Sequence, residues 1–399
     1  MNLTRPLLSL ALLALLAIGP ALEPAAAAQD PQPKFLIYAG WHGNFIPTPQ
    51  FIHDNLAFLE TRPFHGLVVY LRNPNLTVNA TTDAMSTTPM SYPDISAMLD
   101  PIKNLPFSRL RENFGYVLGK SPPDFFDDWT IPIQNFANLA RALKEAGLKG
   151  FFFDNEAYFE PWGEYPGGVA YPLTSLSDYQ AQAALRGRQV MEAMVAEFPE
   201  IIVLSLHGPY ISDPYSVLRL GFAGVPDRNQ LLGPFCVGFL QGAGSSARCV
   251  DGGELYWCRT VQDFADTYTL RRYDIASDAA DCPYIPLSLR PSWPDLITIS
   301  YGVPDRPVGT IPMNPPVLTT TLGNALQRAD QYVWFYTEDR TFLLPESQGG
   351  ATQEWVDAVR VAIGLPPDPS SVVRSGCGLL GVEGVVIFAI LLLVRPRRR

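Results

Sequence analysis

The chain has 399 residues and a formal net charge of −10, from 39 acidic and 29 basic side chains. Hydrophobic residues make up 47% of the sequence, which is enough for a large core and excludes a wholly disordered chain. The excess of acidic residues, with no basic stripe, argues against nucleic acid or an anionic membrane surface as the partner and favours a neutral substrate.

Residues 1–28 have the pattern of a secretory signal peptide. Arg5 supplies the positive charge, Leu7–Ile18 is an apolar run, and Ala26–Ala28 is a small-residue cleavage site. The apolar run is shorter than the ~20 residues that a membrane-spanning helix needs. We therefore expect an exported chain, and an uncleaved membrane anchor is the alternative.

Residues 29–365 alternate between strand-like and helix-like segments and predict a single domain. Eight strand–helix pairs in a row are typical of one α/β fold, the (β/α)8 or TIM barrel, here with extended loops after the strands. A doubly wound sheet is the alternative, but no glycine-rich phosphate loop follows the first strand. The expected strands are Lys34–Trp41, Gly66–Leu71, Asn113–Gly119, Gly150–Asp154, Ile201–His207, Pro234–Leu240, Leu296–Val303 and Gln331–Thr337. The expected helices are Thr48–Glu60, Asp94–Lys103, Ile131–Ala146, Leu176–Phe198, Asp213–Leu220, Val261–Ile275, Leu318–Asp330 and Thr352–Ile363.

The most informative segment is Gly150–Tyr158, with the sequence GFFFDNEAY. Three phenylalanines in a row predict a buried parallel strand, and this strand runs directly into Asp154 and Glu156. Unpaired carboxylates are costly to bury, and at the carboxyl end of a barrel strand they are normally catalytic. We expect Glu156 to be a general acid and Asp154 to orient it or to raise its pKa.

A second carboxylate is needed if the reaction is the cleavage of a glycosidic bond. One carboxylic acid protonates the leaving oxygen, and a second carboxylate attacks the sugar or activates water. Glu338 after the eighth strand and Glu254 in the loop after the expected sixth strand are the two candidates, and the sequence leaves the choice open.

Aromatic and hydrogen-bonding side chains at the expected strand ends suit a sugar. The C–H faces of sugars stack on Trp and Tyr rings, and their hydroxyls bond to Asn, His and Arg. We therefore expect an exported hydrolase that cleaves an external oligo- or polysaccharide without a cofactor. The candidate binding residues are Trp41, His42, Arg72, Asn155, Tyr158, Trp162, His207, Tyr210, Trp257 and Tyr301.

The Asn155-Glu156 pair, with Arg72 after the second strand, resembles the clan A glycoside hydrolases. The resemblance implies that Glu156 is the acid/base, that Asn155 binds a sugar hydroxyl, and that Arg72 supports the nucleophile. In that clan the nucleophile is a Glu at the end of strand seven. This sequence departs from the pattern, because the seventh strand ends near Tyr301 without a carboxylate.

The Asp154-Asn155-Glu156 segment also resembles the Asp-x-Glu motif of family 18 chitinase-like proteins. There the Glu is the acid, and the acetamido group of the substrate is the nucleophile, steadied by the Asp. The two earlier aspartates of that motif are replaced here by Lys149 and Phe152.

Two other classes of function stay open. His42 and His207 with Asp154 and Glu156 would make a metal-dependent hydrolase, although no His-x-His or Glu-x-x-His spacing supports it. A surface barrel that binds carbohydrate without catalysis is the other alternative.

Cys236, Cys249, Cys258 and Cys282 lie close together in the sequence. In an oxidising compartment they predict two disulfides, with three possible pairings. A zinc site is the alternative, but the spacing of the four cysteines is unusual for zinc ligands.

The C-terminal end consists of a Pro/Ser linker, residues 366–374, and a tail, residues 375–399. The tail joins a small-residue motif, Ser375–Gly378, to an apolar run and a terminal arginine cluster. It resembles the tripartite sorting signals of the PEP-CTERM, rhombosortase and MYXO-CTERM types. The resemblance implies a membrane segment, cleavage by a sorting protease, and a final place at the cell surface, in the periplasm or outside the cell. A single-span anchor is the alternative.

Overall fold

The chain divides into Met1–Pro33 and Lys34–Arg399, and the fold described below belongs to the second unit. The signal-peptide prediction and the tail prediction both fall outside the described residues. Within those residues, no helix combines the length and the apolar composition that crossing a membrane requires. The computed structural model describes residues 33–41, 47–75, 77–156, 161–212, 229–277 and 282–369.

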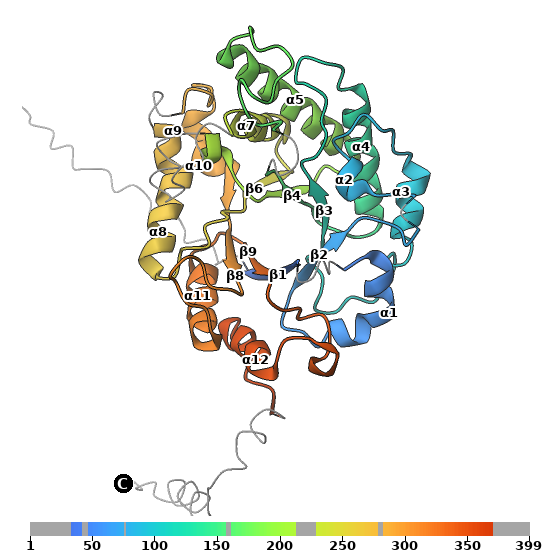
Figure 1. Ribbon diagram of the computed structural model, residues 1–399, viewed down its shortest axis with the longest axis vertical. Helices are drawn as coiled ribbons and strands as arrows, with labels where there is room; N and C mark the ends of the chain where they lie inside the picture. The colour runs from blue at the N-terminus through green and yellow to red at the C-terminus, as the bar shows by residue number, and fades with distance from the viewer. Residues whose placement is uncertain are drawn as a thin grey trace, which may run out of the picture. The chain divides into compact units, whose positions relative to one another are not determined.

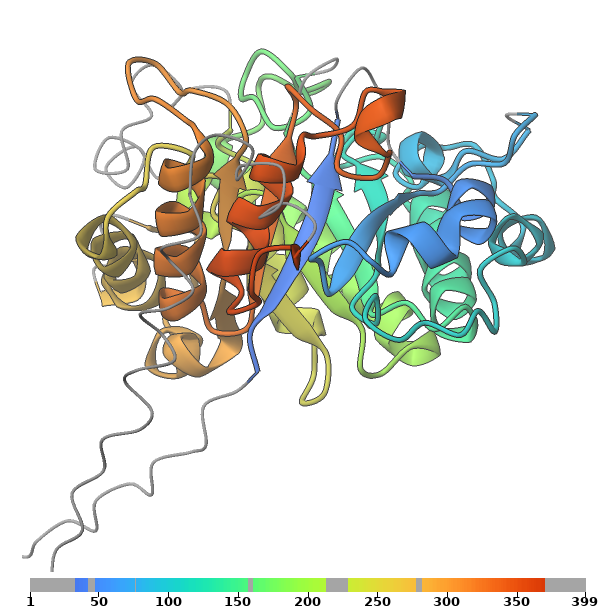
Figure 2. The same cartoon turned by 90° about the horizontal axis from the view of Figure 1, so that it is seen from below.

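In the part of the chain that the structure describes, nine parallel strands form one sheet that curls into a nearly closed barrel, and helices cover its outside (Figures 1 and 2). Hydrogen-bonded neighbours follow the order β7-β6-β5-β4-β3-β2-β1-β9-β8. The strands are β1 (Phe35–Gly40), β2 (Gly66–Tyr70), β3 (Phe114–Leu118), β4 (Gly150–Asp154), β5 (Ile202–Ser205), β6 (Arg248–Asp251), β7 (Ile297–Ile299), β8 (Tyr301–Pro304) and β9 (Tyr332–Thr337).

The strands at the two ends of this order, β7 and β8, explain why nine strands make an eight-position barrel. Only Ser300 separates β7 from β8, and its N–H donates to the carbonyl of Asp251 at 2.8 Å. β7 pairs with β6, and β8 pairs with β9, so together they occupy the seventh position and join the two sides of the sheet. The predicted (β/α)8 barrel is therefore confirmed.

Several helices begin at side-chain caps, and the helices pack around the strands. Thr48, Ser175, Thr260 and Asn314 each accept a hydrogen bond from a backbone N–H in the first turn of a helix. The predicted helix Asp213–Leu220 lies outside the described residues. The helices are α1 (Pro49–Leu59), α2 (Ala80–Asp83), α3 (Tyr92–Leu99), α4 (Thr130–Glu145), α5 (Leu176–Glu197), α7 (Leu232–Gly242), α8 (Val261–Thr269), a π-helical turn η4 (Leu270–Asp274), α9 (Ile275–Ser277), α10 (Trp293–Leu296), α11 (Pro315–Arg328) and α12 (Gln353–Ala362), with short 3-10 turns η2 (Pro209–Ser212), η5 (Arg290–Ser292) and η6 (Glu346–Gln348).

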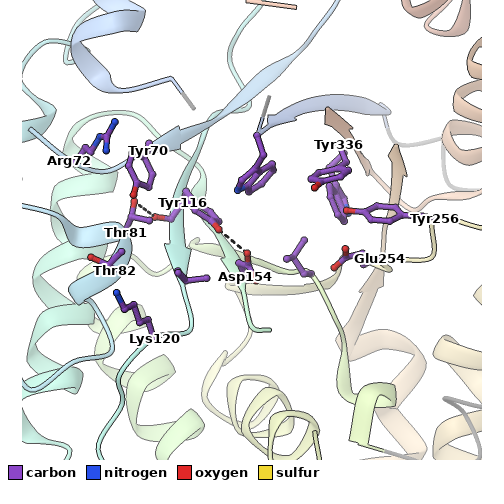
Figure 3. A pocket seen from close by; sticks show the side chains of 14 residues that line it. Tyr70, Arg72, Thr81, Thr82, Tyr116, Lys120, Asp154, Glu254, Tyr256 and Tyr336 are labelled. Atoms are coloured by element: carbon purple, nitrogen blue, oxygen red, sulfur yellow. Dashed lines mark hydrogen bonds between the residues drawn. The ribbon is translucent and has the colours of Figure 1, made fainter. Parts of the chain in front are cut away.

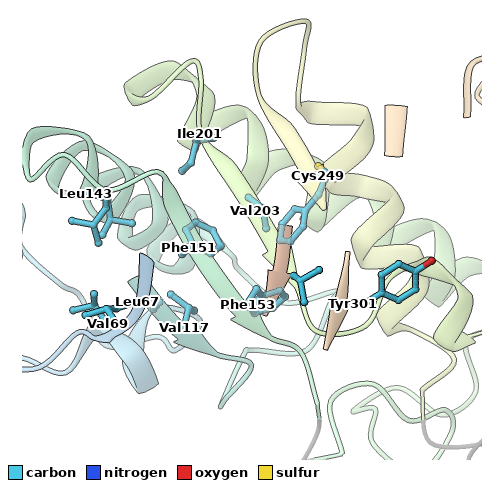
Figure 4. Packing of buried hydrophobic residues seen from close by; sticks show 14 of the residues in the cluster. Leu67, Val69, Val117, Leu143, Phe151, Phe153, Ile201, Val203, Cys249 and Tyr301 are labelled. Carbon is cyan, nitrogen blue, oxygen red and sulfur yellow. The ribbon is translucent and has the colours of Figure 1, made fainter. Parts of the chain in front are cut away.

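Alternate residues of each strand serve two separate cores, because successive side chains of a strand point to opposite faces. One face packs against the helices, as Phe151, Phe153 and Val203 do in Figure 4. The other face fills the barrel. We call the buried residues of that face the inner cluster: Ile37, Ala39, Val68, Phe114, Tyr116, Phe152, Ile202, Leu204, Leu206, Val250, Tyr332 and Trp334.

The sixth strand is not where the sequence predicted it. Pro234–Leu240 belongs to helix α7, and the strand is the four-residue segment β6. The apolar run of α7 reflects burial against α5 rather than a strand: a Cβ on Gly238 would lie 2.2 Å from the carbonyl oxygen of Ala184. A short continuous apolar run is compatible with a buried strand or a buried helix, and here the packing of α7 against α5 stabilises the helix.

The disulfide prediction was wrong. Cys236, Cys249, Cys258 and Cys282 are buried thiols, and no disulfide joins them. Cys236 in α7 and Cys249 in β6 pack as small apolar side chains. Burial raises the pKa of Cys236 to about 12, so this thiol stays protonated near neutral pH.

Candidate active site

A cavity of about 600 Å³ opens at the carboxyl ends of the strands (Figure 3). Its walls combine aromatic rings with charged groups of both signs. It is lined by Trp41, Tyr70, Arg72, Thr81, Thr82, Tyr116, Leu118, Lys120, Asp154, Leu206, Glu254, Tyr256, Trp334 and Tyr336.

Strand periodicity accounts for most of this lining. Trp41 and Asp154 each follow an inner-cluster side chain, Ala39 and Phe152, by two residues. Arg72 and Lys120 continue the same alternation beyond the ends of β2 and β3. The residues that fill the barrel below and those that line the cavity above are therefore one face of the sheet.

Asp154, the last residue of β4, is buried and held by two hydrogen bonds. The Tyr116 hydroxyl donates to Asp154 Oδ2 at 2.7 Å, and the Glu156 backbone N–H donates to Oδ1 at 3.2 Å. Burial, and then the negative charge of Glu156, raise the pKa of Asp154 well above its usual range. Because both oxygens are engaged, this carboxyl group is fixed in orientation.

Glu156, His207 and Glu254 form a compact cluster beside the cavity, from the ends of β4, β5 and β6. His207 Nε2 lies 3.5 Å from Glu156 Oε1 and 3.3 Å from Glu254 Oε2. The three potential ligand atoms all lie within 4.8 Å of one another. Glu156 is not part of the cavity lining, but 28% of its side chain is exposed, against 15% for Glu254.

Three hydrogen bonds from two residues hold His207 in place. The Asn155 side chain forms two hydrogen bonds with the His207 backbone, donating to its carbonyl at 2.8 Å and accepting from its N–H at 3.0 Å. The Tyr210 hydroxyl lies 2.9 Å from His207 Nδ1. Burial alone lowers the pKa of His207, but the hydrogen bond with Glu156 and the charges of Glu254 and Glu156 outweigh it and raise this pKa to about 9. The imidazole is therefore protonated at neutral pH.

Glu254 is the carboxyl group of the cluster that lines the cavity. Burial, followed by the charge of Glu156, raises the pKa of Glu254 to about 7. A carboxylic acid with this pKa holds a proton half of the time near neutral pH, which suits a general acid.

Behind the cluster lies a buried ion pair. Arg271, from the π-helical turn η4, places Nη1 2.8 Å from Asp251 Oδ1, and both side chains are fully buried. Arg271 also donates to the carbonyl of Ser300 at 2.9 Å. The pair thus ties β6 to the residue between β7 and β8. Gly208 is required beside it, because a Cβ there would lie 2.2 Å from Asp251 Oδ2.

The structure separates the two candidates for the second carboxylate. Glu338 follows β9, is paired with Arg306 (Nε–Oε2 2.5 Å) and is not among the residues that line the cavity. Its backbone N–H donates to the buried Asp305 at 2.9 Å. Only Glu254 of the two lies within 4.8 Å of the Glu156 carboxylate in the cluster.

The predicted binding residues fall into three groups. Trp41 and Arg72 line the cavity. Asn155, His207 and Tyr210 are buried and hydrogen-bonded to one another, and they are not among the residues that line the cavity. His42 and Tyr158 lie outside the described residues.

The third group points away from the cavity. Trp162 is buried against the helices and donates to the carbonyl of Gly119 at 3.0 Å. The Tyr301 hydroxyl donates to the carbonyl of Phe264 at 2.6 Å, on the helix side of β8. Trp257 is packed against the same outer core.

Sequence reasoning missed several cavity residues that strand periodicity marks. Tyr70 and Tyr116 share the inward face with Val68 and Phe114, and Lys120 continues it. Applying the two-residue period outward from each predicted strand would have found them. Tyr256, in the loop after β6, carries no such signal.

No protein-family model matches the sequence, and no curated protein is similar to it. Three solved structures illustrate its likeness to known folds. They are active domain 2 of a thermostable chitinase from Pyrococcus furiosus (12% identity, TM-score 0.41, 88% of this chain and 98% of that chain), a β-mannanase from the blue mussel Mytilus edulis (11%, 0.40, 82% and 91%), and a 3-keto-D-glucoside 4-epimerase from E. coli (14%, 0.39, 82% and 99%). Likeness at this level assigns no activity to this chain.

Proposed function

We propose that this protein hydrolyses glycosidic bonds in a glycan, with Glu156 and Glu254 as the catalytic pair. The observation that carries the proposal is their spacing: the two carboxylates lie within 4.8 Å of each other beside the cavity. Carboxyl groups ~5 Å apart are typical of glycosidases that retain the anomeric configuration, whereas inverting enzymes leave room for a water between them.

The environments of the two carboxyl groups support different roles for them. Glu254 lines the cavity and has a pKa raised to about 7, so it is the proton donor. Glu156 is the nucleophile, a role opposite to the one that the sequence predicted for it. In the first step the Glu156 carboxylate attacks the anomeric carbon, and the Glu254 proton passes to the leaving oxygen. In the second step Glu254 takes a proton from water, which attacks the same carbon and releases Glu156.

The neighbouring groups support this pair. Protonated His207 contacts both carboxylates and offsets their mutual repulsion. Asp154 is a positioning residue, because it accepts the Glu156 backbone N–H while Tyr116 fixes its other oxygen.

The aromatic walls of the cavity suit the apolar faces of sugar rings. Tyr256 and Tyr336 stack with their ring centroids 5.1 Å apart, and the ring centroids of Trp41 and Tyr336 lie 5.5 Å apart. Figure 3 shows Tyr256 and Tyr336 beside Glu254, so a sugar stacked on this wall would lie close to the proposed acid.

Variants of the two carboxylates test the proposal on a broad glycan panel. Glu254→Gln is expected to lower kcat/KM on natural glycans by about 10²–10⁴-fold. It should retain much of its activity on 2,4-dinitrophenyl glycosides, whose leaving group needs no proton. Glu156→Gly should lose activity on both, and azide should restore it with a glycosyl azide of inverted anomeric configuration.

Two further variants make this test decisive. Glu192→Gln, on the exposed face of α5, is the control for the loss of one carboxylate. Glu338→Gln tests the rival candidate, and a loss as large as that of Glu254→Gln would contradict the assignment. If the wild-type protein binds glycans but cleaves none, the protein is a carbohydrate-binding barrel instead.

A metal-dependent hydrolase is the second candidate, because Glu156, His207 and Glu254 offer three ligand atoms within 4.8 Å. The cluster differs from the predicted metal set: Glu254 joins it, and both oxygens of Asp154 are engaged elsewhere. Titration with Zn²⁺ and Mn²⁺, with activity measured before and after a chelator, separates the two functions. Tight binding that His207→Gln abolishes, together with chelator-sensitive activity, would favour the metal.

Export and surface sorting are part of the proposal, and they rest on residues 1–28 and 375–399. Fractionation of cells that produce the full chain, with mass spectrometry of its ends, tests them. A full-length product that stays in the cytoplasm would contradict them.

A further inference from the structure

The two sides of the cavity differ in charge. Glu254 comes from the end of β6, whereas Arg72 and Lys120 follow β2 and β3. In the strand order β2 and β6 are four positions apart, which places them across an eight-position barrel from each other. Figure 3 shows the same separation, with Tyr116 and Asp154 between the acidic side and the basic side.

Arg72 is already oriented for a ligand. Its guanidinium carbon lies 4.6 Å from the centre of the Tyr70 ring, and both side chains line the cavity. Stacking on an aromatic ring fixes the plane of the guanidinium and leaves its N–H donors available at the edge. Within the described parts of the chain, no carboxylate forms an ion pair with Arg72.

The charges define where a negative group on a ligand can lie. On the acidic side, the carboxylates of Glu156 and Glu254 repel an anion. On the basic side, the guanidinium of Arg72 matches a carboxylate or sulfate through paired N–H donors, and the ammonium of Lys120 adds a second positive charge to the same wall.

We propose that the Arg72–Lys120 side of the cavity binds an anionic substituent, a carboxylate or a sulfate ester, on a sugar unit next to the one held at Glu254. The substrate is then an acidic glycan rather than the neutral one that the net charge of −10 favours. Net charge describes the whole surface, whereas recognition depends on the local potential inside the cavity. The inference deepens the proposed function and rests on it.

Binding of matched oligosaccharide pairs to the full-length protein tests the inference without turnover. The probes are oligogalacturonides and their methyl esters, glucuronoxylan oligosaccharides and the same backbones without glucuronate, and chondroitin sulfate oligosaccharides before and after desulfation. We expect one charged member to bind about tenfold or more tightly than its neutral partner, as a charge-assisted hydrogen bond implies. Which pair responds distinguishes a carboxylate from a sulfate.

Substitutions then locate the preference. Arg72→Gln should abolish it, Arg72→Lys should restore part of it, and Lys120→Met should reduce it. Arg141→Gln is the control: it removes the same charge from the exposed face of α4, where Arg141 pairs with Glu145 at 3.2 Å. A preference that survives both Arg72→Gln and Lys120→Met, or no preference in any pair, would overturn the inference.

The outcome is distinguishable from failure of the proposed function. Tight, Arg72-dependent binding of an acidic glycan that is never cleaved keeps this inference and removes the hydrolase. Cleavage of neutral glycans alone, sensitive to Glu254→Gln, keeps the hydrolase and removes this inference.

Discussion

Two clusters of charged side chains meet near the end of β6, and they differ in burial and in the balance of their charges. Asp251 and Arg271 form a closed pair, with 2.8 Å between Oδ1 and Nη1 and no exposure of either side chain. Glu156, His207 and Glu254 form an open group with two carboxylates for one imidazole, partly exposed beside the cavity.

The two clusters differ in whether their side chains can exchange a proton near neutral pH. Arginine stays charged at any ordinary pH, so the Asp251–Arg271 pair is neutral and permanent. When both carboxylates are ionised, the second cluster keeps one negative charge even with His207 protonated, and the pKa of Glu254, raised to about 7, allows a proton to come and go. A buried ion pair that does not exchange a proton contributes to stability, whereas a cluster that can gain and lose a proton near neutral pH is suited to acid–base catalysis.

The largest effect on stability should come from opening the closed pair. Arg271→Met would leave the Asp251 charge buried without a partner and should lower the free energy of unfolding by about 3–5 kcal/mol in urea denaturation. Arg188→Met, which removes an exposed pair with Glu192, should cost no more than about 1 kcal/mol. Equal costs for the two substitutions would contradict the structural role of Arg271.

The open cluster should reveal itself in the pH dependence of stability. The folded protein binds the His207 proton more tightly than the unfolded chain does, with a pKa of about 9 instead of 6.5. This contribution is therefore complete below pH 6.5 and is lost as the pH rises to about 9, by about 3 kcal/mol in total.

Urea denaturation at several pH values measures this contribution. His207→Gln should remove the slope between pH 6.5 and 9. A slope that is unchanged in His207→Gln would show that another group titrates.

Catalysis should follow the Glu254 proton. Because Glu254 must be protonated to donate, kcat/KM on a natural glycan should fall about tenfold per pH unit above its pKa of about 7. Glu254→Gln assayed on a 2,4-dinitrophenyl glycoside should lack this alkaline limb. If the limb persists in that variant, the proton donor is a different residue.

The smallest expected effect is that of a reductant. Cys236 lies beside the open cluster, with its sulfur 3.5 Å from Asn155 Nδ2, and no disulfide joins it to another described cysteine. Dithiothreitol should therefore leave the Tm unchanged, whereas loss of a disulfide typically costs about 2–5 kcal/mol. A clear drop in Tm would contradict the absence of a disulfide among the described cysteines.

Local pattern predicted most of the barrel and one part of the site. Phe151–Phe153 and the other clear strands were predicted within two residues or so, because hydrophobic burial leaves a period that a short segment carries by itself. The error at Pro234–Leu240 has the same origin. A short apolar run indicates that a segment is buried, but it does not distinguish a buried strand from a buried helix.

The sequence by itself determined that strand-end carboxylates, Asp154 and Glu156, would stand at the mouth of a parallel barrel, because neighbours in the chain and the alternation of a strand are local properties. Only the tertiary structure decided that Glu254 rather than Glu338 joins Glu156, and that His207 lies between them. Closure of the barrel sets those distances, and closure depends on how strands far apart in the chain pair with one another.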